Sequence, residues 1–195
     1  ITDSLVGSEM CIRDRSMTPY RKVAQYKSTQ ALAQRWKELG VSIPMDDKIL
    51  SASEDSPLAT PFQFGALTVG NRWCIHPMEG WDAETDGRPT SRTLTRWKNF
   101  GASGAKLIWG GEAAAVQPDG RANPNQTLAV EENREGLTAL LRACKETHFD
   151  HWGTGDDFVV GLQLTHSGRF CRPEGKAFRP RMAYRHPLLL SLIHI

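Results

Sequence analysis

The sequence has little of what marks a nucleic-acid-binding or membrane protein. It contains no basic tract, and its 24 Lys and Arg residues nearly balance 22 Asp and Glu residues, so the formal net charge is only +2. This balance gives no electrostatic reason to bind nucleic acid or an anionic surface. No apolar run approaches the roughly 20 residues that a membrane-spanning helix requires. We therefore expect a soluble protein with neither nucleic acid nor a membrane as a partner.

Cysteine is also scarce. Cys11, Cys74, Cys144 and Cys171 lack the close paired spacing that is typical of zinc sites and disulfide frameworks. We therefore expect no metal site, no disulfide and a reducing, cytoplasmic setting. A hydrophobic content of 39% and a charged content of 24% are those of an ordinary globular chain. The length of 195 residues predicts one domain, or one domain and part of another.

The two ends of the chain differ in character from the rest. Residues 1–16 have neither the basic region nor the apolar core of a signal peptide. They resemble translated sequencing-adapter read-through, and so do residues 190–195, so we exclude both segments from the prediction of the fold. On this hypothesis Met17 is the natural start and the gene continues past the last residue. A disordered native tail is the weaker alternative.

Residues 17–60 are predicted to form an N-terminal helical extension and a linker. Within them, residues 28–39 have a helical pattern in which Trp36 lies on an apolar stripe, and Gly40 is a stop signal. Residues 51–61, rich in Ser, Pro, Asp and Thr, indicate a connector. Two short apolar segments, 62–64 and 67–69, then flank a Gly-Ala turn and predict a hairpin.

Strand and helix patterns alternate in the remainder. We expect strands at 72–78, 105–109 and 158–164, each an apolar run that suits a parallel strand covered on both faces. A helix is predicted from Thr90 or Ser91 to about Phe100, closed by Gly101. A second helix is predicted from about Glu132, with an apolar stripe of Leu137, Leu140, Leu141 and Cys144.

This order predicts an α/β fold with a parallel sheet, either an open doubly wound sheet or a (β/α)8 barrel. No Gly-x-Gly-x-x-Gly follows the first strand, which argues against a dinucleotide-binding fold. A complete barrel takes about 250 residues. We therefore predict that residues 61–189 are the N-terminal part of a TIM barrel that stops after about its third strand.

Polar and small residues gather where the three predicted strands end. These stretches are 76–80, 110–114 and 163–166, and ligands of α/β folds bind at such carboxyl ends. The Gln163 amide can donate and accept hydrogen bonds side by side, matching the edge of a pyrimidine-like ring. Small residues at 110–114 leave room for something flat near the backbone. Pro77 has no N–H, and its carbonyl is available to a ligand. Together these features predict a site for a flat heteroaromatic cofactor.

Several motifs resemble the old yellow enzyme family of NADH:flavin oxidoreductases. They are Asn71-Arg72 with Pro77-Met78, then Leu107-Ile108 through Glu112-Ala113 with Pro118-Asp119-Gly120-Arg121, and finally Gln163-Leu164-Thr165-His166-Ser167-Gly168-Arg169. They span residues 61–169 in the family's order and with similar spacing. Each motif alone is a weak signal, but the ordered set is specific.

The resemblance implies a TIM barrel with non-covalent FMN at the carboxyl ends of its strands. Pro77 and Met78 should contact the flavin through their backbone, Ala113 should be the small residue beneath the ring, and Gln163 should bond its pyrimidine edge. In this family NADH or NADPH reduces the FMN, which passes a hydride to a small electron-poor alkene such as an α,β-unsaturated carbonyl. The proton donor and the substrate-anchoring residues should lie beyond the chain end, so the fragment itself is expected to be inactive. Its oligomeric state stays open.

Glu79 departs from the family pattern, in which Thr, Ser or Cys often follows the Pro-Met pair. A carboxylate near the flavin would lower its reduction potential unless it is protonated or turned away. We therefore count Glu79 among the cofactor-binding candidates, with a role in substrate binding as the alternative.

Three alternatives remain from the sequence. The first is an iron–sulfur-containing branch of the same family, such as dienoyl-CoA reductases or amine dehydrogenases. The second is a metal-dependent TIM-barrel hydrolase with His76, Glu79 or His166 as ligands, although no His-x-His pair marks the first strand end. The third is a binding or degenerate barrel without activity.

Overall fold

The computed structural model of the protein describes residues 21–46 and 48–184. The chain divides into two units, residues 1–49 and 50–195, which are described separately below. The adapter-like segments 1–16 and 190–195 and the expected start at Met17 lie outside the described residues.

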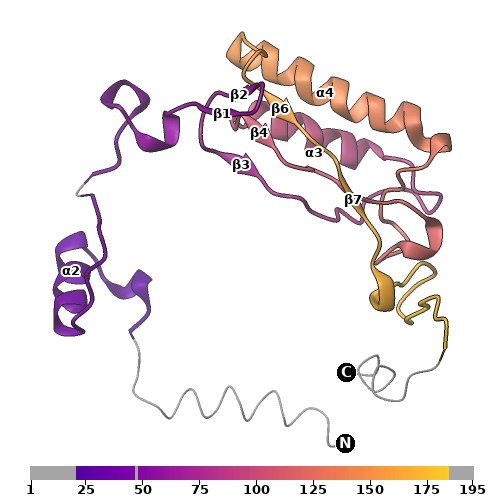
Figure 1. The fold of residues 1–195 in the computed structure, drawn as a ribbon, viewed down its shortest axis with the longest axis horizontal. Coiled ribbons are helices and arrows are strands. Elements are labelled where there is room, and N and C mark those ends of the chain that lie inside the picture. The colour runs from indigo at the N-terminus through magenta and orange to yellow at the C-terminus, as the bar shows by residue number, and fades with distance from the viewer. Residues whose placement is uncertain (1–20, 47, 185–195) are drawn as a thin grey trace, which may run out of the picture. The chain divides into compact units, whose positions relative to one another are not determined.

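The first unit consists of a short 3-10 helix, Val23–Gln25, and the helix α2, Thr29–Glu38 (Figure 1). The Ser28 hydroxyl caps α2 by accepting a hydrogen bond from the backbone N–H of Ala31 at 3.2 Å. Gly40, with φ of +67°, follows the last turn in the left-handed conformation that ends helices. The helix predicted over residues 28–39, with its stop at Gly40, is therefore confirmed.

The second unit begins with two 3-10 turns, Ala52–Glu54 and Pro57–Ala59, within the predicted connector. The predicted hairpin is confirmed: β1, Phe62–Phe64, pairs antiparallel with β2, Leu67–Val69. Gly65 at its tip has a φ of +59°, which only glycine adopts without strain.

A three-stranded parallel sheet follows, in the order β3-β4-β6, made of Cys74–Ile75, Leu107–Ile108 and Val159–Val160. Asn71 joins the first two strands, because its amide donates to the Gly104 carbonyl at 2.9 Å and its oxygen accepts from the Lys106 N–H at 3.1 Å. The parallel order predicted from the sequence is thus confirmed, although the strands are shorter than expected.

The single strand predicted over 158–164 is wrong, because the segment forms two strands in different sheets. After β6 the chain leaves the first sheet at Gly161, and β7, Gln163–Thr165, pairs in parallel with β5, Ala113–Ala115. Gly110 follows β4 with φ of +67° and turns the chain, so β5 does not continue the line of β4. The sequence pattern predicted no strand at β5.

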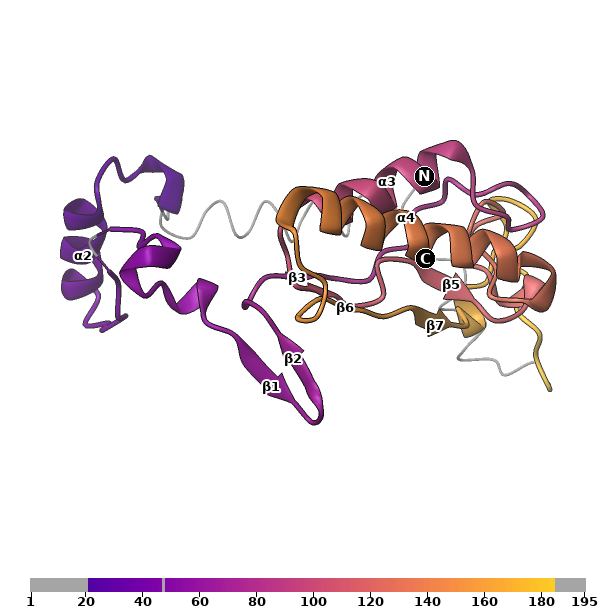
Figure 2. The same ribbon diagram turned by 90° about the horizontal axis from the view of Figure 1, so that it is seen from above.

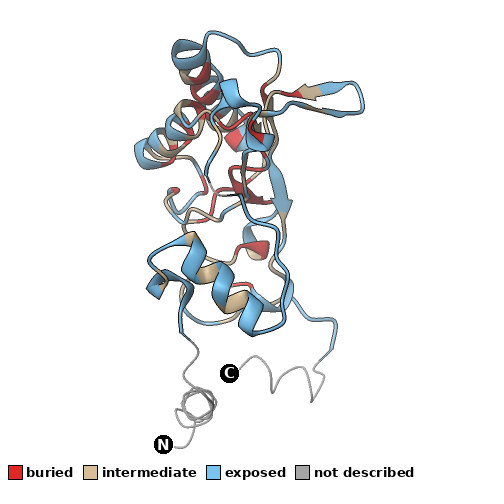
Figure 3. Ribbon diagram, turned by 90° about the vertical axis from the view of Figure 1, so that its left-hand side faces the viewer, coloured by how far each residue is buried: buried red, intermediate tan, exposed pale blue. Residues whose placement is uncertain are grey.

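Two helices cover one face of the sheet β3-β4-β6, as Figure 2 shows. They are α3, Ser91–Ala102, and α4, Arg134–Trp152, the latter preceded by a 3-10 turn, Glu131–Asn133. The core lies between helices and sheet, where Figure 3 shows the buried segments. Its buried members are Trp97, Ala105, Ile108, Leu140, Cys144 and Phe158.

The predicted stop at Gly101 is also wrong, because α3 continues to Ala102. A Cβ atom at Gly101 would overlap the backbone carbonyl of Cys144 on α4. This glycine therefore lets two helices approach closely, and Gly104, with φ of +80°, makes the turn instead.

The fold is α/β, as predicted, with strands and helices alternating along the second unit. Over residues 50–184 the sheet β3-β4-β6 has two open edges, β3 and β6, and no closed barrel is formed. Its face away from the helices, with the hairpin, lines an apolar cavity of about 380 Å³ that includes Leu107 and Trp109. Within the described ranges, no helix combines the length and hydropathy needed to traverse a lipid bilayer.

Candidate functional site

The carboxyl ends of the strands bring three predicted site residues together. The backbone N–H of Ala113 donates to the carbonyl of Met78 at 3.0 Å, and Ala113 lies opposite Gln163 in the β5–β7 ladder. Because the segments that follow parallel strands leave a sheet at one edge, residues separated by 35 and 50 positions in the sequence become neighbours where β5 and β7 begin. Pro77 and Glu79 flank Met78 in the same loop.

These residues differ in accessibility. Met78 is 63% exposed and Gln163 is exposed, whereas Ala113 is only 2% exposed and offers a ligand almost no side-chain surface. The Gln163 carboxamide has no hydrogen-bond partner among the residues that the structure describes. The expectation that Gln163 is buried is therefore wrong. Gln163 and its neighbour Leu164, which point to opposite faces of β7, are both exposed, so the carboxamide is accessible to a ligand.

The small residues after β4 serve the protein's own packing. A Cβ atom at Gly110 would lie 2.7 Å from the Cβ of Gln163, and one at Gly111 would lie 2.8 Å from Ile108. The room that the sequence suggested for a flat ligand at these glycines is therefore filled by neighbouring strands and side chains.

A charged cluster behind this edge has no counterpart in the sequence prediction. The fully buried Glu112 carboxylate accepts from Arg96 Nη2 at 2.8 Å and from the Trp97 indole at 3.4 Å. Arg96 also donates to Asp82 from Nη2 at 2.7 Å and from Nε at 3.2 Å. A glutamate within an apolar stretch is a signal that a cation must lie nearby, but nothing in the sequence pattern identifies Arg96.

The charges of this cluster stabilise one another. Burial alone would raise the pKa of Asp82, but hydrogen bonds and the charge of Arg96 outweigh it and hold the pKa below its usual value. Burial likewise opposes the charge of Arg96, yet the two carboxylates raise its pKa. Asp82 and Arg96 are therefore both ionised at neutral pH.

Glu79 is engaged by a neighbour in its own loop. Its carboxylate accepts a hydrogen bond from the Trp81 indole N–H at 3.0 Å. Trp81 has a φ of +51°, which is rare for an aromatic residue, and its side chain is 51% exposed. The loop thus presents a strained, exposed aromatic residue beside the carboxylate that departs from the family pattern.

A second buried charged cluster lies at the opposite ends of the strands. Lys106 Nζ lies 2.7 Å from Asp157 Oδ1 and 3.0 Å from His148 Nε2. His148 is fully buried; its Nδ1 lies 3.0 Å from the Gly101 carbonyl, and its ring stacks on Phe158 at 3.8 Å. Because this cluster is at the amino ends of β4 and β6, it belongs to the framework and not to the candidate site.

One residue of the sequence motifs also serves the framework. The guanidinium of Arg121 donates to four backbone carbonyls, those of Thr85, Pro118, Pro124 and Pro173. It therefore ties the loops around the strand ends together and is not free to bind a ligand.

The hydrolase alternative gains no support from the described residues. His76, Glu79 and His166 belong to no group of three His, Cys, Asp or Glu side chains that could hold a metal ion in the described part of the chain. His166 instead accepts a hydrogen bond at Nδ1 from the Gly168 N–H at 3.1 Å.

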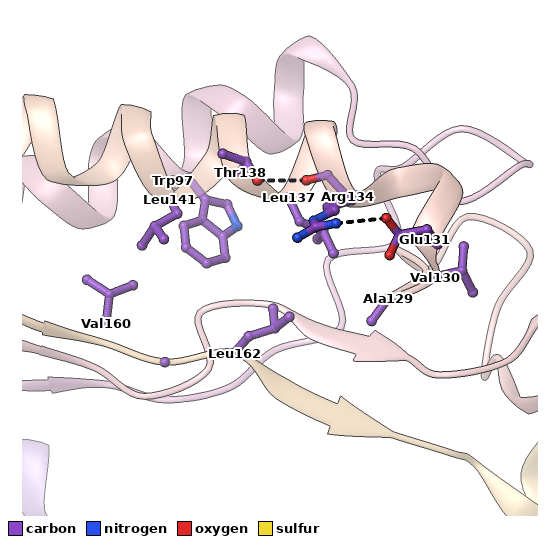
Figure 4. A pocket seen from close by; sticks show the side chains of 11 residues that line it. Trp97, Ala129, Val130, Glu131, Arg134, Leu137, Thr138, Leu141, Val160 and Leu162 are labelled. Carbon is purple, nitrogen blue, oxygen red and sulfur yellow. Dashed lines mark hydrogen bonds and ion pairs between the residues drawn. The ribbon is translucent and has the colours of Figure 1, made fainter.

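A cavity beside α4 is a poorer candidate than the strand ends. Figure 4 shows it between α4 and the open edge of β6, and its volume is about 550 Å³. Apolar side chains such as Leu137 and Leu141 dominate its lining, and its charged members, Glu131 and Arg134, already pair at 3.0 Å. It therefore lacks free polar groups that could orient a ligand.

No protein-family model and no curated protein sequence matches the chain. Among solved structures, 2-naphthoyl-CoA reductase in complex with 2-naphthoyl-CoA matches with a TM-score of 0.52 and 18% identity over 60% of this chain and 16% of its own. The old yellow enzyme from Pichia sp. AKU4542 matches with a TM-score of 0.50 and 17% identity over 60% of this chain and 28% of its own. The old yellow enzyme from Trypanosoma cruzi reaches a TM-score of 0.49 at 25% identity, over 60% and 29%.

These similarities concern the fold. One of these structural neighbours, the Pichia protein, is an old yellow enzyme, and this is the family that the sequence motifs resemble. The chain spans less than a third of the length of each of these three proteins.

Proposed function

We propose that this chain is part of an FMN-dependent oxidoreductase that passes a hydride from NADH or NADPH to a small electron-poor alkene. One observation carries the proposal: Met78, Ala113 and Gln163, which are far apart in the sequence, meet just beyond the carboxyl ends of β3, β4 and β6, where β5 and β7 begin. These are the positions that the family resemblance assigns to FMN.

The residues at this edge fit a flat, polar-edged ring. Gln163 presents an exposed carboxamide that can donate and accept at once, which suits a uracil-like edge. Met78 offers exposed apolar surface, and the Pro77 carbonyl accepts no hydrogen bond from the described residues. Ala113 is buried, and its backbone N–H and carbonyl already bond Met78 and Gln126, so its part in the proposal is that of the small residue beneath the ring. Bound FMN supplies the hydride-transfer chemistry, and these residues hold and orient it.

The decisive test is FMN binding by a protein that carries this chain together with the remaining strands of the proposed barrel. We expect a yellow protein whose flavin absorption is bleached by NADH or NADPH and restored by an enone. Gln163→Leu should weaken FMN binding about tenfold or more, because it removes both amide hydrogen bonds. Gln30→Leu, at an exposed position of α2, is the matched control. Equal FMN affinity of the two variants would refute the assignment of Gln163.

The same preparation distinguishes the alternatives. Iron and acid-labile sulfide in addition to FMN would assign the iron–sulfur branch of the family. A colourless protein with a stoichiometric metal ion would assign the hydrolase. A colourless protein without metal would indicate a binding or degenerate barrel.

A further inference from the structure

The buried residue Glu112 connects the three segments of the candidate site, through its carboxylate, its backbone carbonyl and the adjoining residue Ala113. The side chain of Glu112 accepts from the Gly80 N–H at 3.4 Å, in the loop after β3. Its backbone carbonyl accepts from the Gln163 N–H at 3.1 Å, at the start of β7. Its successor, Ala113, donates its N–H to Met78. Glu112 therefore links the three segments on which the proposed FMN contacts lie.

Arg96 fixes the orientation of this carboxylate. Its guanidinium lies between Glu112 and Asp82 and donates from Nη1 to the Gly111 carbonyl at 3.3 Å. There is no room for a side chain at Gly80, because a Cβ atom there would overlap Arg96. A planar, multidentate cation thus holds the loop after β3 and the segment after β4 in one arrangement.

We infer that Glu112 is the positioning residue of the site: with Arg96 it sets the spacing between Met78, Ala113 and Gln163. Because Glu112 is fully buried, it touches no ligand and acts through these neighbours. The link to FMN rests on the proposed function, whereas the positioning itself is a property of the chain alone.

The chain offers a matched control at the other end of the same strands. Lys106 and Asp157 form an ion pair at 2.7 Å that is also largely buried, yet it faces the amino ends. Glu112→Gln and Asp157→Asn each remove one charge with little change of shape. If Glu112 merely stabilised the fold, the two variants would have similar effects on the site.

Amide hydrogen exchange in the full chain tests the positioning without a cofactor. We expect Glu112→Gln to speed exchange at Ala113 and Gln163 about tenfold or more. The substitution removes the charge-assisted hydrogen bond between Arg96 and the Glu112 carboxylate, which holds the backbone around both amides in place. Exchange at Gly70, whose N–H donates to the Asp157 carbonyl at 2.9 Å, should change less than about twofold. Asp157→Asn should show the reverse pattern. Equal effects of both variants at Ala113 and Gln163, or none, would overturn the inference.

FMN affinity is measured in parallel in the longer protein described above, by the quenching of flavin fluorescence. We expect about tenfold weaker binding for Glu112→Gln and a change within about twofold for Asp157→Asn; equal affinities would contradict the inference. Absence of FMN binding in the wild type would refute the proposed function, and the exchange pattern would still decide the positioning role. If Glu112→Gln does not fold, Arg96→Lys, which keeps the charge but loses the planar fork, should give the same exchange pattern.

Discussion

Acidification should weaken the fold through His148, because this imidazole is buried in its neutral form. Burial lowers the pKa of His148, and the nearby Lys106 lowers it further, while the Gly101 carbonyl and Asp157 oppose the shift. Since the ammonium group of Lys106 can only donate, Nε2 must accept, and Nδ1 then carries the proton and donates to Gly101. A second proton on the ring would face the Lys106 ammonium at 3.0 Å.

The sign and size of the effect follow from this pKa. The folded chain binds fewer protons than the unfolded chain, in which His titrates near 6.5. The stabilisation is therefore complete above about pH 6.5 and is lost as the pH falls toward the folded pKa. Within that window each pH unit should remove up to about 1.4 kcal/mol from the free energy of unfolding. The lowered pKa of Asp82 acts in a separate window, below about pH 4.

Urea unfolding at pH 7.5, 6.5 and 5.5, followed by circular dichroism, measures the slope. His148→Gln can still accept from Lys106 and donate to Gly101, so its free energy of unfolding should be lower throughout but nearly independent of pH in this range. His151→Gln, an exposed position on the same helix, should keep the wild-type slope. Identical slopes for the wild type and His148→Gln would refute the protonation argument.

Three further substitutions test how sequence features build the fold. Gly101→Ala should lower the free energy of unfolding by about 3 kcal/mol, because a Cβ would overlap the Cys144 carbonyl; an unchanged urea midpoint would contradict the close approach of α3 and α4. Gly110→Ala should lower the free energy of unfolding, measured by thermal unfolding, by about 1–3 kcal/mol. The reason is that Gly110 has a φ of +67° and an added Cβ would press on Gln163, so the FMN affinity should fall as well. Thr90→Ala should cost about 1 kcal/mol, since the Thr90 hydroxyl caps α3 and donates to the Asp82 carbonyl at 2.6 Å; equal helix protection in hydrogen exchange would exclude a capping role.

Local signals in the sequence determined the elements and their order. The cap signal at Thr90 or Ser91 placed α3, an apolar stripe and Gly40 placed α2, and the apolar runs located β3, β4 and β6. These features depend on residues within one or two turns, so the sequence pattern contains them. The polar and small residues after the predicted strands likewise marked the stretches 76–80, 110–114 and 163–166, which contain Met78, Ala113 and Gln163.

Only the tertiary structure decided how these elements meet. The break at Gly161 and the ladder between Ala113 and Gln163 depend on a partner 50 positions away, which no local period encodes. The pairing of Glu112 with Arg96 also depends on long-range contacts. A buried carboxylate is stable only beside a cation, but the sequence does not show which cation the folded chain brings to it. Local sequence preferences thus determined the helices and strands of this protein, whereas long-range packing and charge pairing determined the geometry of its candidate site.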